Sequence, residues 1–279
     1  MILRMLELPE TFHFEGNAVR WGCLGAGSPL VLIHGTPFSS QVWRRVLPHL
    51  TDMRSVYFYD LVGYGLSEQK DGQDVSLGVQ NRLLTALFNE WGLDRPDVVA
   101  HDFGGATALR GYVLNGLRFG SLTIFDAVAL APWGSPFVQH VRQHQAAFAG
   151  MPDYMHRALL AAYLLTAAHN KLSDEAIEIY SRPWIGAVGQ PAFYRQIAQM
   201  NQAHTDEIER HYCQLDCSVH VLWGHEDTWI PAEKGDALAA LISDKPCTHI
   251  AGAGHLVQED RPEAIVAAIL NQIGTNNPC

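Results

Sequence analysis

The sequence predicts an α/β protein with a mostly parallel, doubly wound sheet, and two observations lead to that prediction. Short apolar runs alternate with helix-period segments over the first 130 or so residues, and the same alternation returns near the end of the chain. The composition fits a folded chain, because 48% of the 279 residues are hydrophobic and only 17% are charged. That length accommodates one α/β domain with an insertion.

The first half of the chain contains most of the expected strands. Residues 11–15 and 18–24 form a hairpin pattern around Gly16 and Asn17, and 29–33 is a continuous apolar run, as expected for a strand buried on both faces. Further strands are predicted at 55–60, 97–102 and 121–127. Helices are predicted at 39–50, where Ser39 or Ser40 would be the N-cap, and at 77–91 and 104–117.

The second half begins with an interruption of this rhythm. Residues 132–213 contain no buried-strand run and show helical patterns at 136–148, 154–168, 173–180 and 192–211. We interpret this segment as a helical cap, or lid, inserted into a core domain made of residues 1–131 and 214–279. The core pattern resumes with strands at 218–224 and 248–251 and helices at 233–242 and 262–273.

Charge and cysteine usage exclude several functions. The formal net charge is −10 without basic clusters, which argues against nucleic acid or an anionic membrane as a partner. The apolar runs 158–168 and 237–242 are too short to span a bilayer, and the N-terminus lacks a signal-peptide layout. The five cysteines are an odd number without zinc-site spacing, so we interpret them as reduced thiols of a cytoplasmic protein.

Residues 98–105 (VVAHDFGG) carry the strongest functional signal. An apolar run ends in Ala100, Asp102 follows after one residue, and Gly104 and Gly105 come next. This is the layout of a nucleophile elbow, a strained strand-to-helix turn that needs small residues because its backbones pack closely. Where the nucleophile is usually Ser, this chain has Asp102.

An aspartate nucleophile changes the available chemistry. A carboxylate is ionised at neutral pH and needs no base to activate it. Attack on an ester carbonyl would form an anhydride, whereas attack on an sp3 carbon with a leaving group forms an ester that water can cleave. Asp102 therefore favours substrates such as epoxides or alkyl halides over esters.

Three further positions complete a catalytic arrangement. The loop after the strand 29–33 offers the backbone N–H of Thr36 to an oxyanion hole, and Phe103 offers the second N–H. Asp227 follows the strand 218–224, and His255 follows the strand 248–251. The order nucleophile, acid, histidine is the one that this elbow motif carries. Asp126, which directly follows the apolar run 121–125, is a second candidate for the acid.

Each of these residues also has a simpler interpretation. Asp102 could be a helix N-cap, His255 a surface histidine and Asp227 an ordinary turn residue, while His34 would organise its loop. His140 and His144, four residues apart, could reach a metal, but without a third acidic ligand nearby a solvated helix face is favoured. The order and placement of the set favour the catalytic interpretation, and the proposed chemistry requires no metal or organic cofactor.

Two more motifs carry a resemblance to a known family. The segment 34–44 (HGTPFSSQVWR) resembles the HGxP loop and following helix of α/β-hydrolases, and 60–67 (DLVGYGLS) is similar to their D-x-x-G-x-G-x-S loop. With Asp102, the chain resembles the aspartate-nucleophile branch, which includes epoxide hydrolases, haloalkane dehalogenases and haloacetate dehalogenases. The resemblance covers essentially the whole chain and implies the α/β-hydrolase fold and a cis peptide between Thr36 and Pro37.

Leaving-group chemistry separates the members of the branch. Haloalkane dehalogenases hold the halide with a Trp after the nucleophile and usually an Asn in the HGxP loop, where this chain has Phe103 and Thr36. Haloacetate dehalogenases hold the substrate carboxylate with Arg at the positions of Phe103 and Ala106. Epoxide hydrolases also favour Trp at the position of Phe103, so this residue departs from their pattern at a position that bears on the shape of the substrate.

The resemblance to epoxide hydrolases implies two cap tyrosines that donate to the ring oxygen. Residues 189–195 (GQPAFYR) match the motif around one of them, which makes Tyr194 a ring-opening donor. Tyr163 is our choice for the second, with Tyr154 as an alternative; either could instead be core packing with its hydroxyl at the rim.

We therefore expect an epoxide hydrolase that forms a vicinal diol, with a small hydrophobic organic substrate, water as co-substrate and a monomeric or homodimeric state. The alternatives are a haloalkane or haloacid dehalogenase and, in another class, a non-catalytic small-molecule binder on the same fold. The expected substrate-binding residues are His34, Pro37, Trp133 and Trp184.

Overall fold

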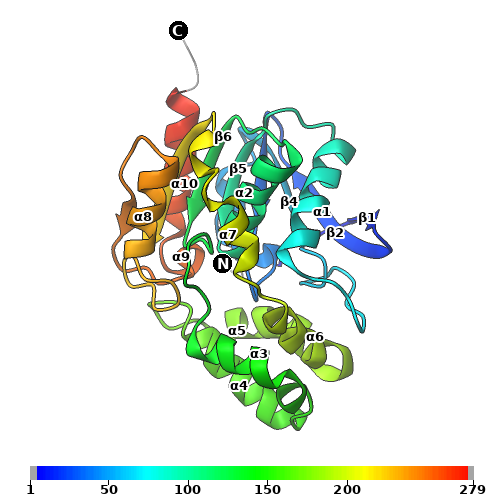
Figure 1. The fold of residues 1–279 in the computed structure, drawn as a ribbon. Coiled ribbons are helices and arrows are strands. Elements are labelled where there is room, and N and C mark those ends of the chain that lie inside the picture. Colours follow the sequence, from blue (N-terminus) through cyan, green and yellow to red (C-terminus); the bar gives the residue numbers. More distant parts are fainter. Residues whose placement is uncertain (1–4, 276–279) are drawn as a thin grey trace.

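The computed structural model describes residues 5–275, with side chains to residue 271, and its centre is an eight-stranded sheet (Figure 1). The strand order is β1-β2-β4-β3-β5-β6-β7-β8. The strands are β1 (Glu10–Phe14), β2 (Asn17–Leu24), β3 (Ser28–Ile33), β4 (Arg54–Tyr59), β5 (Asp97–His101), β6 (Ser121–Phe125), β7 (Ser218–Gly224) and β8 (Thr248–Ile250). The sheet confirms the predicted fold class.

Parallel pairing brings the ends of the central strands to one edge. β1 and β4 both pair antiparallel with β2, whereas every pair from β4–β3 to β7–β8 is parallel. Residues Leu30 to Ile33 of β3 are at most 1% exposed, as expected for a strand covered on both faces. The residues that follow β3, β5, β6, β7 and β8 therefore meet at the carboxyl edge of the sheet.

Helices connect the parallel strands and cover the sheet. Within the core these are α1 (Leu77–Glu90), α2 (Phe103–Asn115), α8 (Glu233–Ile242), α9 (Val257–Asp260) and α10 (Pro262–Thr275). Helices α1 and α2 pack side by side in front of the strands in Figure 1.

Between β6 and β7 the chain forms a run of helices with no strand in this described stretch. They are α3 (Pro136–Ala149), α4 (Asp153–Leu165), α5 (Asp174–Ser181), η3 (Arg182–Trp184), α6 (Gly186–Ala198), α7 (Ala203–Glu209) and η4 (Tyr212–Gln214). Figure 1 shows α3 to α6 gathered below the sheet, whereas α7 returns beside α2. We call residues 132–213 the insertion.

Two predicted helices differ from those observed. The segment 39–50 forms two short 3-10 helices, η1 (Ser40–Arg45) and η2 (Leu47–His49), because Pro48 has no N–H to continue an α-helix. The segment 192–211 is divided into α6 and α7. Gln199 ends α6, and its side chain binds the backbone of Gln73 and Val75 between the two helices.

In the described part of the chain no helix is both long and apolar enough to cross a membrane. The cysteines within it, Cys23, Cys213, Cys217 and Cys247, are free thiols. Cys279 lies outside the described residues.

Candidate active site

Asp102 occupies a strained turn between β5 and α2. Its φ of 52° and ψ of −118° are unusual for a residue with a side chain. The turn depends on glycine at two close approaches. A Cβ on Gly104 would lie 2.5 Å from the carbonyl oxygen of Ile33, and one on Gly35 would lie 2.3 Å from the Cβ of Asp102. The local backbone therefore has the geometry of the nucleophile elbow that the sequence predicts.

The carboxylate of Asp102 is held by the loop after β3. Its Oδ1 accepts a hydrogen bond of 2.6 Å from the backbone N–H of Thr36, and Asp102 is only 3% exposed. Phe103 begins α2, with its ring buried. The Thr36–Pro37 peptide is cis, as the family resemblance implies. One carboxylate oxygen is thus fixed by a backbone donor, and Oδ2 is left for chemistry.

His255 connects Asp102 to Asp227. Its Nδ1 lies 2.9 Å from Oδ2 of Asp227, and its Nε2 lies 3.5 Å from Oδ2 of Asp102. Oδ1 of Asp227 accepts from the backbone N–H groups of Trp229 at 2.7 Å and Ile230 at 3.0 Å. The structure therefore brings the three predicted residues together, with the acid oriented by the loop after β7.

The protonation of His255 follows from its neighbours. Burial lowers the pKa of His255, but the charges and hydrogen bonds of Asp227 and Asp102 outweigh burial and raise it well above the usual value. Behind it, Nε2 of His101 lies 2.9 Å from the carbonyl oxygen of His255, and burial lowers the pKa of His101 well below its usual value. A neutral His101 therefore donates to this carbonyl and supports the loop that carries His255.

Asp126, the alternative acid, lies next to this arrangement. It follows β6, is fully buried and has a φ of 45°. Its Oδ1 accepts a hydrogen bond of 2.9 Å from the backbone N–H of Gly224. The structure shows Asp227, and not Asp126, hydrogen-bonded to Nδ1 of His255.

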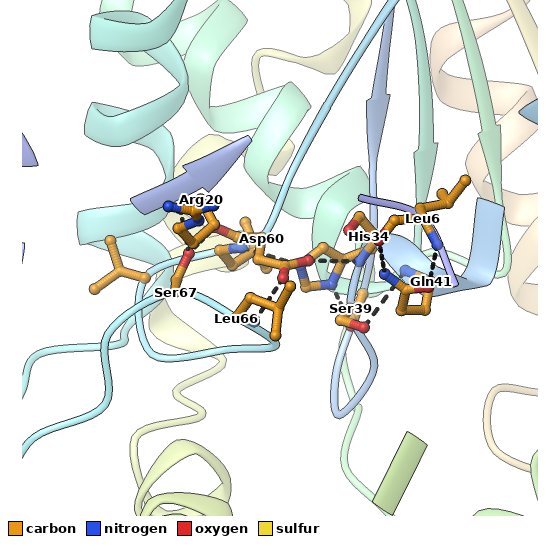
Figure 2. Close-up of polar contacts among 12 residues, drawn as sticks. Leu6, Arg20, His34, Ser39, Gln41, Asp60, Leu66 and Ser67 are labelled. Atoms are coloured by element: carbon orange, nitrogen blue, oxygen red, sulfur yellow. Dashed lines mark hydrogen bonds and ion pairs between the residues drawn. The ribbon is translucent and has the colours of Figure 1, made fainter. Parts of the chain in front are cut away.

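His34 supports the loop after β3 from the side (Figure 2). Its Nδ1 donates to the carbonyl of Gly35 at 2.9 Å, and its Nε2 accepts from the N–H of Leu61 at 3.0 Å. Asp60 accepts from the N–H groups of Ser40 and Leu66, each at 2.7 Å, and so ties the 60–67 loop to η1. The ring of His34 is therefore fully used in organising loops, although the sequence pointed to it as a substrate-binding residue.

A cavity of about 40 Å³ adjoins Asp102, which is room for water or a small ligand. It lies where the insertion meets the core. The residues that line it are Thr36, Asp102, Val128, Trp133, Gly134, Ser135, Val138, Tyr163, Met200, Trp229 and Ile230. The lining is mostly apolar, and among these described residues none is cationic.

Tyr163 and Trp229 form one wall of the cavity. Their rings stack with centroids 4.6 Å apart, and Trp229 also stacks on His255 at 4.9 Å. Within the described chain the hydroxyl of Tyr163 has no hydrogen-bond partner, and burial together with the charge of Asp102 raises its pKa. Trp229 was not predicted from the sequence, where its only signal is its position two residues after Asp227.

The other two tyrosine candidates, Tyr194 and Tyr154, are not among the residues that line the cavity. Tyr194 is fully buried in α6, and its hydroxyl lies 2.8 Å from Nδ1 of His156. Because Nε2 of His156 faces the carbonyl of Trp184 at 2.8 Å, Nε2 carries the proton and Nδ1 accepts from Tyr194. Burial raises the pKa of Tyr194 to about 12. Tyr154, the alternative, is 73% exposed.

The tryptophan N–H groups near the site already have acceptors. Trp133 lines the cavity but donates to Oγ1 of Thr205 at 2.9 Å. Trp184 is buried behind the loop after β3 and donates to the carbonyl of Pro37 at 2.6 Å. The N–H of Trp229 lies 2.9 Å from Oγ1 of Thr166.

Among the described residues, two groups of side chains have the donor types for a metal ion. One is Asp126, Asp227 and His255 of the site itself, and the other is Asp236, Cys247 and His249 at the edge of the sheet. His140 and His144 pack ring against ring but belong to neither group in the described chain.

The sheet order, the elbow and the Asp–His–Asp arrangement define the class of protein as a hydrolase on a doubly wound α/β fold. A family model described as the alpha/beta hydrolase family matches residues 30–268, and the chain belongs to that family. It is 54% identical to an alpha/beta hydrolase fold protein of known structure from Burkholderia ambifaria, with a TM-score of 0.94 over 96% of this chain and 99% of that one.

Two curated relatives have named activities. One is a 2-hydroxy-6-oxo-2,4-heptadienoate hydrolase from Pseudomonas putida, 26% identical over 88% of this chain and 89% of the relative. The other is haloalkane dehalogenase 2 from Mycobacterium tuberculosis, 24% identical over 95% of this chain and 97% of the relative. The chain is thus a hydrolase whose relatives are named for different substrates.

Proposed function

We propose that this hydrolase opens epoxides through a covalent ester on Asp102 and releases vicinal diols. The observation that carries the proposal is the pairing of Asp102 with Tyr163 in one apolar cavity. A carboxylate supplies the nucleophile for an sp3 carbon, and a phenol without a protein acceptor is free to donate to the ring oxygen as charge develops there. In this proposal the insertion acts as the cap.

The first step joins substrate to enzyme. Oδ2 of Asp102 attacks a ring carbon, the carbon–oxygen bond breaks, and the ring oxygen takes the proton of Tyr163. Oδ1 becomes the carbonyl oxygen of the new ester, and it already accepts from the Thr36 N–H at 2.6 Å. The donor for the later oxyanion is therefore in place before the reaction starts.

The second step releases the diol. His255, oriented by Asp227, takes a proton from water, and the hydroxide attacks the ester carbonyl. The departing alkoxide takes the proton from His255, and the carboxyl proton left on Asp102 returns to the Tyr163 phenolate. Nε2 of His255 faces Oδ2 of Asp102 at 3.5 Å in the free protein, and esterification of Asp102 removes that charge and leaves Nε2 to bind this water.

The cavity favours a neutral substrate. Its lining contains the carboxylate of Asp102 and, among the described residues, no Lys or Arg. A substrate that carries a carboxylate, as the dienoate named for the Pseudomonas putida relative does, would meet repulsion without a cationic partner. We therefore propose that a dienoate is not the substrate.

Dehalogenation is the second candidate, favoured by similarity to haloalkane dehalogenase 2 over 95% of this chain. The same ester would form, and halide would leave in place of an alkoxide. Against this candidate, the N–H groups of Trp133 and Trp229 already have acceptors, and Phe103 has no side-chain donor. Tyr163 and Ser135 would be the hydroxyl donors from the cavity wall.

Intact-protein mass of a His255→Gln variant, incubated with a panel of epoxides and haloalkanes, tests both candidates. We expect the variant to stop at the ester and gain the mass of a whole epoxide, located on Asp102 by peptide mapping. A gain equal to an alkyl group without its halogen would show dehalogenation instead. Asp102→Ala is the matched control and should form no adduct.

A further inference from the structure

Asp126 is a buried carboxyl group that the proposed steps do not use. It follows β6 as Asp227 follows the neighbouring strand β7, and neither residue of this pair has more than 7% of its surface exposed. Donor atoms of Asp126, Asp227 and His255 all lie within 4.8 Å of one another. Oδ1 of Asp126 accepts from Gly224, whereas Oδ2 is buried and has no hydrogen-bond partner in the part of the chain described.

The three carboxyl groups around His255 cannot all be ionised at once without a large cost in free energy. Asp102 and Asp227 flank its ring nitrogens at 3.5 Å and 2.9 Å, and Asp126 adds a third carboxyl group in the same dry region. One imidazolium balances one carboxylate, so three ionised carboxylates would leave two buried charges uncompensated. Two carboxyl groups this close share a site in which one holds a proton more strongly.

We propose that Asp126 carries a proton at neutral pH, directs it from Oδ2 toward Asp227, and so acts as a positioning residue that limits the basicity of His255. The description of His255 as the base rests on the proposed function, whereas the proton on Asp126 does not. Asp126 is the member of the pair to hold the proton, because Asp227 accepts two backbone N–H groups and the ring N–H of His255. Asp126 accepts a single backbone N–H.

The electrostatics of the surroundings agree with this assignment. Burial and the neighbouring charge of Asp227 raise the pKa of Asp126 well above its usual value, against the opposing effect of His255. The thiol of Cys247 is the other titratable group that senses Asp126, and burial is the main reason that its pKa is raised to about 12. At neutral pH this thiol is therefore uncharged and adds no charge beside Asp126.

A neutral Asp126 matters for catalysis because His255 must release its proton to act as a base. A second ionised acid beside the ring would hold the imidazolium more tightly and remove the neutral form from the working pH range. The proton on Asp126 thus leaves one acid, Asp227, to orient the ring.

Infrared difference spectroscopy of the folded protein tests the proton directly and needs no substrate. We expect the wild type at neutral pH to show the carbonyl stretch of a protonated carboxyl group that is missing in Asp126→Asn. In Asp227→Asn the like charge is gone, so Asp126 should ionise beside His255 and the band should disappear as well. If the band is absent from the wild type, or persists in Asp227→Asn, the proposal that Asp126 holds a proton directed toward Asp227 is wrong.

Nuclear magnetic resonance titration of labelled histidine gives a second readout, with His255 assigned by its loss in His255→Gln. Asn at position 126 resembles the protonated acid, so we expect the midpoint of the His255 titration to stay within about 0.3 pH units of the wild type. An ionised Asp126 in the wild type would instead make Asp126→Asn lower this midpoint by about one pH unit or more. A lack of epoxide turnover would refute the proposed function, but the infrared and magnetic-resonance measurements would still test the proton on Asp126 because neither needs a substrate.

Discussion

Tyr163 and Tyr194 are both tyrosines of the insertion, and their hydroxyl groups have different surroundings. Tyr163 lines the cavity beside Asp102, and its hydroxyl has no acceptor in the described chain. The hydroxyl of Tyr194 donates to His156, whose other nitrogen is held by the carbonyl of Trp184. A motif that matches Tyr194 to a ring-opening donor gives no information about His156, which lies 38 residues earlier in the chain.

This difference predicts the effects of removing each hydroxyl. We expect Tyr163→Phe to slow ester formation from an epoxide by about 10²- to 10⁴-fold, the range for loss of a general acid. Tyr194→Phe, the matched variant, should affect unfolding free energy more than chemistry, because it leaves Nδ1 of His156 without its donor. Rapid-quench measurement of adduct formation would check this, and an equal loss in both variants would contradict the assignment.

The pKa of His255 predicts two pH effects. Since this pKa is raised, the charged ring stabilises the fold fully below about pH 6.5, and that stabilisation is lost as pH rises through the folded-state pKa. Esterification of Asp102 removes one of the charges that raise it. We therefore expect the rate of ester hydrolysis, measured in single turnovers, to rise with pH, and the midpoint of that rise to lie below the pH at which His255 titrates in the free enzyme. If the two midpoints coincide, this expectation is wrong.

The three residues of the proposed catalytic arrangement could be predicted from the sequence because each follows a recognisable strand. The runs that end before Asp102, Asp227 and His255 are β5, β7 and β8, and parallel pairing brings their ends to one edge. Trp229 and the partners of Tyr194 could not be predicted in the same way, since they depend on side-chain directions across the boundary between insertion and core.

At the scale of elements, the short helix α9 connects the loop of His255 to the insertion. Asp260 at its end accepts from the backbone N–H groups of His169 at 2.8 Å, Asn170 at 2.8 Å and Gly254 at 2.9 Å. Glu259 beside it binds Arg44 of η1 and the hydroxyl of Tyr180 in α5. One helical turn therefore joins the catalytic loop, the core and the insertion.

Removal of the Asp260 carboxylate should damage stability and catalysis together. We expect Asp260→Ala to lower the free energy of unfolding by about 3 kcal/mol, because three backbone donors lose a buried acceptor. Urea unfolding would measure the change. Asp236→Ala, which removes an exposed carboxylate paired with His249, is the control and should stay within about 1 kcal/mol of the wild type. A similar small effect at Asp260 would contradict the role given to α9.

Strands were predicted better than helices, and the reason is local. A buried parallel strand such as β3 or β5 is an uninterrupted apolar run, which few other structures produce. Helix α6 instead begins at Gly186 and continues through Pro191, where sequence rules place a turn. Its packing against α3 is a tertiary effect that local propensity does not record.

At the scale of the whole molecule, the boundary between core and insertion sets the space for substrate. Met200 lines the cavity and is 5% exposed. We expect Met200→Ala to enlarge the cavity, raise kcat/KM for bulky epoxides relative to small ones, and cost about 2–5 kcal/mol of stability. Competition between two epoxides of different size would measure the ratio, and Leu241→Ala on the exposed face of α8 is the control. An unchanged ratio would place the substrate elsewhere.

The hydrogen bond from Thr36 to Oδ1 of Asp102 makes the two carboxylate oxygens unequal, and this has an isotopic consequence. On the proposed route Oδ2 leaves in the diol, so the hydroxyl added to the substrate comes from the protein, and a water oxygen replaces it in the side chain. In a single turnover in ¹⁸O-labelled water, Asp102 gains the heavy atom and the diol has none. On this route the enzyme would exchange one of its own atoms with solvent in every catalytic cycle.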